Sequence, residues 1–246
     1  MIIDDINVNY IQYGNEEGKD IVLLHGWGQN IEMMKPVGNA MKKEFHITIV
    51  DLPGFGRSNE PKQPMNVENY ADLIKKLLDN LNIENPILIG HSFGGRVSIV
   101  YASKYQTRKL VLLGTPFKRR PKKDSFKIKA MKKMKDILKN EALENWVKNN
   151  VGSKDYRDAS PMMKKVLVET VNMDLTEYAK KINCETLLIW GSNDEAVPVE
   201  YGKELESLIR NSGMVVFENF SHFAYLENIN VTIKVLDKFL EKERGK

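Results

Sequence analysis

Short apolar runs, each bounded by polar or turn-forming residues, recur along most of this 246-residue chain. Continuous apolar stretches of a few residues are typical of parallel strands that are buried on both faces of a sheet. The segment 8–13 alternates polar and apolar residues instead, which predicts an antiparallel edge strand with one solvated face. We predict buried strands at residues 21–24, 47–50, 87–89, 110–113, 187–190 and 215–217.

Between the predicted strands lie segments whose apolar residues recur every three or four positions, which is the spacing of one helix face. The clearest such segment is 67–81, and further helices are predicted from near Phe93 through 102, at 200–210 and at 229–240. Strands that alternate with helices along the chain predict an α/β fold, with a mostly parallel central sheet and helices on both of its faces.

This alternation stops between Gly114 and Lys181, where the sequence is helical and polar and has no strand-like run. We therefore predict a helical lid at residues 115–182, inserted into an α/β core made of residues 1–114 and 183–246. Because the insertion follows the carboxyl end of a strand, we expect it over the sheet edge where open α/β sheets bind ligands.

The composition, with 42% hydrophobic and 28% charged residues, is that of an ordinary globular protein. No segment approaches the roughly 18 apolar residues of a membrane span, and acidic residues near Met1 do not fit a signal peptide. One cysteine, Cys184, excludes an internal disulfide, so we expect a cytoplasmic protein. The four histidines show no metal-ligand spacing, and no metal or cofactor is predicted.

A serine between two glycines follows the predicted strand 87–89, in the segment Gly90-His91-Ser92-Phe93-Gly94. This G-x-S-x-G pattern is typical of the nucleophile elbow, a strained turn between a strand and a helix that exposes the serine hydroxyl. Glycines are needed on both sides because the neighbouring backbone leaves no room for a Cβ atom. Ser92 is the candidate nucleophile, and the alternative is an ordinary turn serine.

A serine nucleophile needs a base that takes its proton and an acid that orients the base. Asp194 lies in a turn after strand 187–190, and His222 follows strand 215–217 directly before the last helix. The order Ser, Asp, His, with each residue after a strand, is that of α/β-hydrolases. Two alternatives to Asp194 as the acid are its neighbour Glu195 and Asp124, which follows the previous strand.

An oxyanion hole requires two backbone N–H groups that point at the developing negative charge. We expect one from Phe93, directly after the nucleophile, and the other from Trp27 in the loop His25-Gly26-Trp27-Gly28. The remaining polar residues near these motifs are interpreted as structural. His25 is expected to be a hydrogen-bonded structural residue, Asp51 and Arg57 to brace a loop, and His46 and His91 to have no role in catalysis.

Taken together, these segments resemble the α/β-hydrolase superfamily from about residue 21 to the C-terminal helix, excluding the insertion. The first loop and Asp51-Leu52-Pro53-Gly54-Phe55-Gly56-Arg57-Ser58 further resemble the pimeloyl-acyl-carrier-protein methyl ester esterases. Many carboxylesterases and C–C bond hydrolases share these loops. One departure is Ser221 before His222, where the family usually has glycine, and we expect the loop to tolerate it with a slight shift.

The net charge of +4 is unevenly distributed, because residues 117–181 hold 18 Lys/Arg and 9 Asp/Glu, against 19 and 24 elsewhere. These lysines could be the solvated face of a lid helix that covers the pocket. They could also dock an acidic acyl-carrier protein, or contact an anionic membrane surface. Nucleic acid is not expected, since no aromatic residues are interleaved with the charge, and neither is integral membrane association.

The sequence therefore predicts a serine carboxylesterase that cleaves a small-molecule ester through an acyl-enzyme, with Ser92, Asp194 and His222 as its triad. A C–C bond or thioester hydrolase with the same triad remains an alternative. A low-turnover ligand-binding receptor that keeps the triad is another, because the fold alone does not decide the function.

Overall fold

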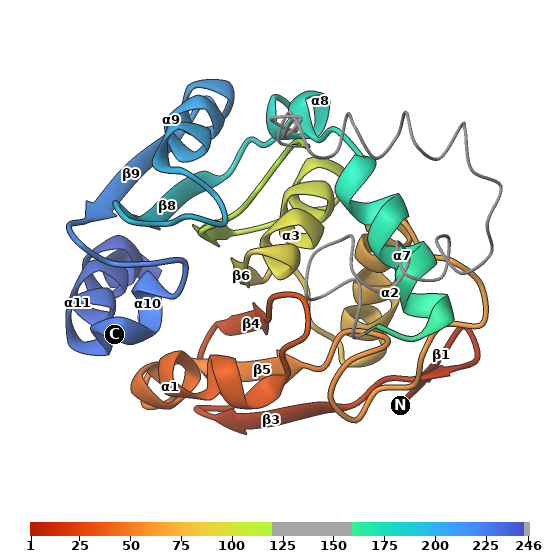
Figure 1. Ribbon diagram of the computed structural model, residues 1–246. Helices are drawn as coiled ribbons and strands as arrows, with labels where there is room; N and C mark the ends of the chain where they lie inside the picture. Colours follow the sequence, from red (N-terminus) through yellow and green to blue (C-terminus); the bar gives the residue numbers. More distant parts are fainter. Residues whose placement is uncertain (120–158, 244–246) are drawn as a thin grey trace, which may run out of the picture.

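The computed structural model describes residues 1–119 and 159–243 (Figure 1). Its central sheet has seven strands in the order β3-β5-β4-β6-β7-β8-β9. All neighbouring strands pair in parallel except the edge strand β3 (Tyr10–Gly14), which is antiparallel to β5 (His46–Val50), as the alternating pattern predicts. The other strands are β4 (Asp20–Leu24), β6 (Ile87–His91), β7 (Lys109–Leu113), β8 (Glu185–Gly191) and β9 (Ser212–Phe217). A separate two-stranded sheet pairs β1 (Ile2–Ile3) with β2 (Ile6–Asn7).

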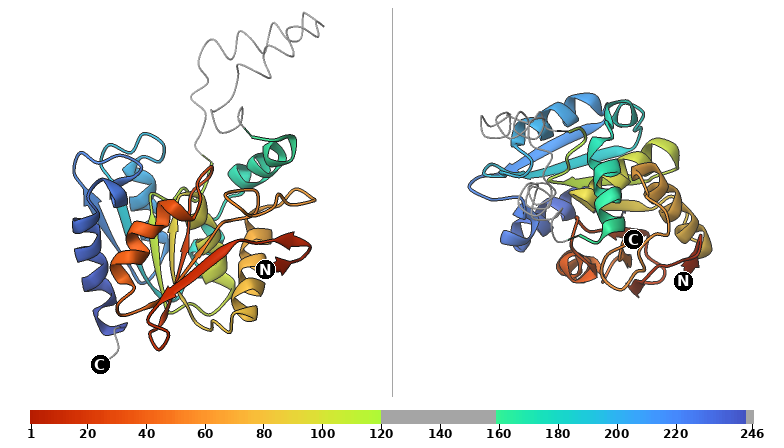
Figure 2. Two further views of the ribbon diagram at one scale, coloured as in Figure 1. Left: turned by 90° about the horizontal axis from the view of Figure 1, so that it is seen from below. Right: turned by 45° about the vertical axis from the view of Figure 1, so that its right-hand side comes forward.

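Each central strand sends alternate side chains to opposite faces of the sheet, which produces two hydrophobic cores. In β6, for example, Leu88 belongs to one core, whereas Ile87 and Ile89 belong to the other. The first face is covered by α2 (Val67–Asn80), α3 (Phe93–Lys104) and α9 (Val199–Leu208). The second face is covered by α1 (Ile31–Met41) and α11 (Ile229–Leu240), and Figures 1 and 2 show both layers. Two short helices, α10 (Ala224–Glu227) and η1 (Glu241–Glu243), flank α11.

Helix α1 was not predicted, because it contains Pro36 and Gly38, two residues that disfavour helix interiors. Asn30 caps its N-terminus by accepting a hydrogen bond of 3.0 Å from the N–H of Glu32. A Cβ atom at Gly38 would lie only 3.0 Å from a methyl carbon of Ile47, so the glycine lets the helix approach the sheet. Tertiary packing therefore outweighs the weak helix propensity of this segment.

Within the predicted insertion, the structure describes residues 115–119 and 159–182. They form α7 (Pro161–Asn172), which lies beyond one end of the sheet strands in Figure 2, and α8 (Thr176–Ala179). Ser160 caps α7 by accepting a hydrogen bond from Met163 N–H. The N–H of Leu175 donates to the carbonyl of Phe117 at 2.7 Å. This bond joins the outgoing segment, residues 115–119 after β7, to the returning segment, residues 159–182 before β8.

The most basic part of the insertion and Asp124 lie outside the described residues. The boundary of a lid at 115–182 and the role of that basic segment therefore stay predictions. No helix among the described residues is long and apolar enough to cross a membrane.

Candidate active site

Ser92 occupies a strained turn between the end of β6 and the start of α3. Its φ of 48° and ψ of −107° are unusual for a residue with a side chain, and this strain is typical of a nucleophile elbow. The N–H of Ser92 donates to the carbonyl of Leu113 at 2.9 Å, and Gly94 N–H donates to the carbonyl of His25 at 3.0 Å. A Cβ atom at Gly94 would collide with the backbone of Leu24, which explains why glycine is needed there.

His222 and Asp194 form a hydrogen-bonded pair, with 2.8 Å between His222 Nδ1 and Asp194 Oδ2. Since a carboxylate only accepts hydrogen bonds, Nδ1 is the donor to Asp194, and Nε2 is left for another group. The Asp194 side chain is fully buried, and its Oδ1 accepts the N–H of Val197 at 2.7 Å. Glu195, the neighbouring alternative, is exposed.

The serine and the histidine–aspartate pair lie at the same edge of the sheet, after the carboxyl ends of β6, β8 and β9. Gly114 connects them: it follows Leu113, which binds the Ser92 N–H, and a Cβ atom on Gly114 would lie 3.1 Å from His222 Nδ1. The same Cβ atom would lie 3.3 Å from Asp194 Oδ2. Gly114 also has a φ of +50°, so both its conformation and its surroundings favour glycine.

The two expected oxyanion-hole residues, Trp27 and Phe93, lie side by side, with 5.4 Å between their ring centroids. Phe93 is the first residue of α3, so its N–H has no carbonyl one turn earlier in the helix. Over the described part of the chain, neither this N–H nor that of Trp27 has a hydrogen-bond acceptor. The use of these two N–H groups as an oxyanion hole stays a prediction.

A family model described as the alpha/beta hydrolase fold matches residues 20–154, which is more than half of the chain. The chain belongs to the α/β-hydrolase family. It is therefore a hydrolase of that family. The elbow with Ser92 and the loops that carry Asp194 and His222, which suggested the resemblance, lie at one edge of the sheet.

Two relatives of this α/β-hydrolase have different named activities. A 2-hydroxy-6-oxononadienedioate/2-hydroxy-6-oxononatrienedioate hydrolase from Pseudomonas putida is 27% identical, over 96% of this chain and 92% of that protein. A pimeloyl-[acyl-carrier protein] methyl ester esterase from Pseudoalteromonas atlantica is also 27% identical, over 86% of this chain and 90% of that protein. Among solved structures, the enol-lactonase from Burkholderia xenovorans LB400 has a TM-score of 0.76 at 23% identity and covers 97% of this chain and 98% of that chain. This structural likeness confirms the predicted fold class.

His91, directly before Ser92 in the elbow, makes contacts that sequence reasoning did not identify. Its ring lies 4.8 Å from the ring of His222, and its Nε2 lies 3.1 Å from the His222 carbonyl oxygen. Its Nδ1 lies 3.2 Å from Gln29 Oε1. Burial lowers the pKa of His91 to about 3, so the ring is neutral and can donate to only one of these two oxygens. These contacts join segments far apart in sequence, which no local motif reveals.

The predicted structural roles of His25 and Asp51 are confirmed. His25 is buried, its Nε2 accepts the N–H of Leu52 at 3.0 Å, and its Nδ1 lies 2.7 Å from the Gly26 carbonyl. Burial lowers the pKa of His25, which keeps the ring neutral. Asp51 braces its loop by accepting the N–H groups of Ile31 at 2.7 Å and Arg57 at 2.9 Å.

Ser221, the departure from the family pattern, has a local structural role. Its N–H donates to Glu227 Oε1 at 3.0 Å, and its hydroxyl also binds that carboxylate. Its carbonyl accepts the N–H of Ala224 at 3.1 Å, which starts the short helix α10. The serine therefore ties the loop that carries His222 to the helix that follows.

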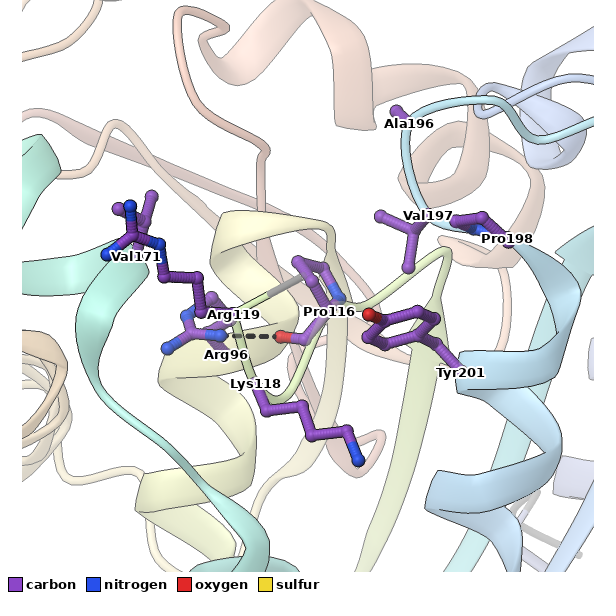
Figure 3. Close-up of a pocket in the computed structure, with 9 residues that line it drawn as sticks. All are labelled: Arg96, Pro116, Lys118, Arg119, Val171, Ala196, Val197, Pro198 and Tyr201. Atoms are coloured by element: carbon purple, nitrogen blue, oxygen red, sulfur yellow. Dashed lines mark hydrogen bonds between the residues drawn. The ribbon is translucent and has the colours of Figure 1, made fainter. Parts of the chain in front are cut away.

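A pocket of about 170 Å³ opens between the start of the insertion, the end of α7 and the loop after Asp194 (Figure 3). Its walls are mostly apolar, with Pro116, Val171 and Val197 from those three segments and the ring of Tyr201 from α9. Three cationic residues, Arg96, Lys118 and Arg119, also line it. Lys118 pairs with Glu204, which raises the Lys118 pKa, and Arg119 donates to Asn172 Oδ1 at 2.6 Å.

Proposed function

We propose that this α/β-hydrolase is a serine esterase that cleaves its substrate through an acyl-enzyme. The observation that carries the proposal is the hydrogen-bonded His222–Asp194 pair at the sheet edge where the strained turn presents Ser92. A buried acid, a histidine with one nitrogen left for another group, and a serine at an elbow are the parts of a nucleophilic triad.

In the proposed reaction, Ser92 Oγ attacks the ester carbonyl while Nε2 of His222 takes its proton. Asp194 holds the ring and stabilises the imidazolium. The tetrahedral oxyanion binds the N–H groups of Trp27 and Phe93, and the loss of one such donor typically costs about 3–4 kcal/mol. The imidazolium then protonates the leaving alkoxide, and water activated by His222 releases the acid from Ser92.

We further propose acyl esters bound to an acidic carrier protein as the substrate class. The support is the relative from Pseudoalteromonas atlantica, named for such a substrate, together with the excess of basic residues in 117–181. The single cysteine is consistent with the cytoplasm as the proposed compartment. Burial raises the pKa of the Cys184 thiol to about 11, so it is not a reactive nucleophile.

The relative from Pseudomonas putida favours a second candidate function, the hydrolysis of a C–C bond in a dienedioate. The same triad serves both reactions, since each requires attack on a carbonyl carbon and protonation of a leaving group. A thioester is a further substrate for the same chemistry. Direct assay of each substrate class separates these candidates.

The experiment is turnover of p-nitrophenyl esters from acetate to laurate by the wild type and by Ser92→Ala. We expect the variant to lose at least about a thousandfold in kcat, because no other group supplies the nucleophile. Turnover that survives in Ser92→Ala would refute the mechanism. Ligand-induced thermal stabilisation without turnover of any ester, thioester or dienedioate would instead support a receptor.

Asp194→Asn tests the assignment of the acid, with Glu195→Gln as its matched control on the neighbouring residue. We expect Asp194→Asn to lower kcat by about three to four orders of magnitude, because the amide does not hold the required tautomer. The exposed Glu195 should be replaceable with less than about a twofold change in kcat. A larger loss in Glu195→Gln than in Asp194→Asn would contradict the assignment.

A further inference from the structure

Arg96 is a buried cation, 4% exposed, that lies one helical turn after Ser92 on α3. Its guanidinium donates to three backbone carbonyls: Nη1 to Pro116 at 2.9 Å, and Nη2 to Thr170 at 2.8 Å and Met173 at 2.5 Å. Figure 3 shows the first of these bonds at the edge of the pocket. The planar fork of an arginine suits such divergent acceptors better than a lysine ammonium does.

The three carbonyls belong to the two ends of the insertion. Pro116 lies on the outgoing segment, shortly after β7 ends. Thr170 lies in the last turn of α7 on the returning segment, and Met173 is the C-cap residue of that helix. The last carbonyls of a helix have no partner within it and carry partial negative charge, so a cation there is favourable. Arg96 thus links both ends of the insertion to the helix that starts at the elbow.

Burial lowers the pKa of Arg96 to about 10, so the group stays charged at neutral pH. Over the described residues its Nε atom has no hydrogen-bond partner. Asp174 is the nearby carboxylate that opposes the effect of burial on this pKa. A buried cation of this kind is costly, and an apolar side chain of similar size would fill the space without that cost. This arrangement indicates a positioning role.

Residues from both ends of the insertion line the pocket in Figure 3. Pro116 and Val171 line that pocket from opposite ends of the insertion, and Arg96 forms part of its wall. Val197 lines it as well, and the N–H of Val197 binds the carboxylate of Asp194. One wall of the pocket is therefore joined, through Val197, to the residue that we propose as the catalytic acid.

We propose that Arg96 is a positioning residue that fixes the two ends of the insertion relative to the elbow, and thereby sets how the pocket binds the apolar part of the substrate. The substrate half of this statement rests on the proposed esterase function. The structural half does not, because it concerns only the hydrogen bonds between Arg96 and the two ends of the insertion.

The test compares Arg96→Met, which keeps the apolar bulk, with Arg96→Lys, which keeps the charge. Lys104→Met, on the same helix and bound to the carboxylate of Asp72 at the surface, is the matched control. Hydrogen exchange is followed in 161–179, which covers α7 and α8, and in the core strand β8. For Arg96→Met we expect about tenfold or greater loss of protection in 161–179 with less than about a twofold change in β8.

The same variants are assayed with p-nitrophenyl acetate and p-nitrophenyl octanoate. In Arg96→Met we expect the KM for octanoate to rise at least about tenfold, with kcat for both esters within about threefold of the wild type. For Arg96→Lys we expect a KM for octanoate between those of the wild type and Arg96→Met, because the lysine ammonium replaces only part of the hydrogen bonding of the guanidinium. Lys104→Met should match the wild type in every measurement.

Equal loss of protection in 161–179 and in β8 would overturn the proposal, because it would show that Arg96 supports only global stability. Wild-type protection in both Arg96 variants would overturn it too. If Arg96→Met does not fold, Arg96→Lys alone decides between these outcomes. A wild type without ester turnover would refute the esterase function, and the exchange comparison would still test the positioning role.

Discussion

At the scale of the residue, the structure explains why a second histidine lies against the candidate base without competing for its proton. His91 is fully buried, and its ring packs 4.8 Å from that of His222. Burial and the nearby His222 lower the pKa of His91 to about 3, so no positive charge arises beside the imidazolium that forms on His222 during the proposed reaction. His91 can therefore hold the His222 carbonyl without repelling that charge.

The neutral His91 gives the protein a predictable sensitivity to acid. Its pKa is near 6.5 in the unfolded chain and about 3 in the folded one, so between these values only the unfolded chain binds the proton. The free energy of unfolding should therefore fall by about 1.4 kcal/mol per pH unit on acidification through this window. We expect His91→Gln to reduce the slope of the unfolding free energy against pH by about that amount, as measured by urea titrations at several pH values between about 6 and 4. His25, whose pKa is also lowered, keeps its own contribution, and an unchanged slope would contradict the assignment.

Residue positions that follow from order along the chain could be predicted, and contacts between distant segments could not. Ser92, Asp194 and His222 each follow a predicted strand in the family order, and the structure gathers them at one edge of the sheet. Arg96 and His91 act on segments 20 or more positions away, such as the Pro116 and His222 carbonyls. Nothing in the local pattern indicates those partners.

At the scale of the element, burial decides which predictions succeed. Strands β4 and β6 are buried on both faces, and their apolar runs locate them closely in the sequence. Helix α1 has a mixed pattern with an internal proline, and the sheet surface against which it packs is made by strands distant from it in sequence. The helix after the elbow begins at Phe93, as predicted, because the elbow glycines let the helix start directly at the turn.

The close approach of α3 to the sheet gives a stability prediction. A Cβ atom at Gly94 would meet backbone atoms of Leu24 and His25. Backbone atoms cannot rotate aside as a flexible side chain can. We expect Gly94→Ala to cost about 3 kcal/mol or more in the free energy of unfolding. The control is Gly213→Ala in β9, where a Cβ atom meets nothing within 4 Å, and its cost should stay below about 0.5 kcal/mol. Equal urea midpoints for the two variants would refute this account of the elbow.

At the scale of the whole molecule, the segment 117–181 and the rest of the chain carry net charges of opposite sign. Residues 117–181 carry twice as many basic as acidic residues, 18 against 9, whereas acidic residues outnumber basic ones in the remainder. A field of this kind attracts an acidic partner over a distance comparable to the Debye length, about 10 Å at 0.1 M salt. It has little effect on a small neutral ester, and this difference makes the docking proposal testable.

We therefore expect kcat/KM for a carrier-bound acyl ester to fall at least about tenfold between about 0.05 and 0.5 M NaCl, because salt screens attraction between exposed charges. The value for a p-nitrophenyl ester should change less than about twofold over the same range. Lys165→Glu in α7 should weaken use of the carrier-bound substrate more than Lys203→Glu in α9, since both lysines are exposed but only Lys165 lies in the basic region. A carrier preference that survives high salt would show that the basic region is not the docking surface. A carrier-bound ester used no better than its free analogue would remove the carrier from the proposed function and leave the esterase mechanism standing.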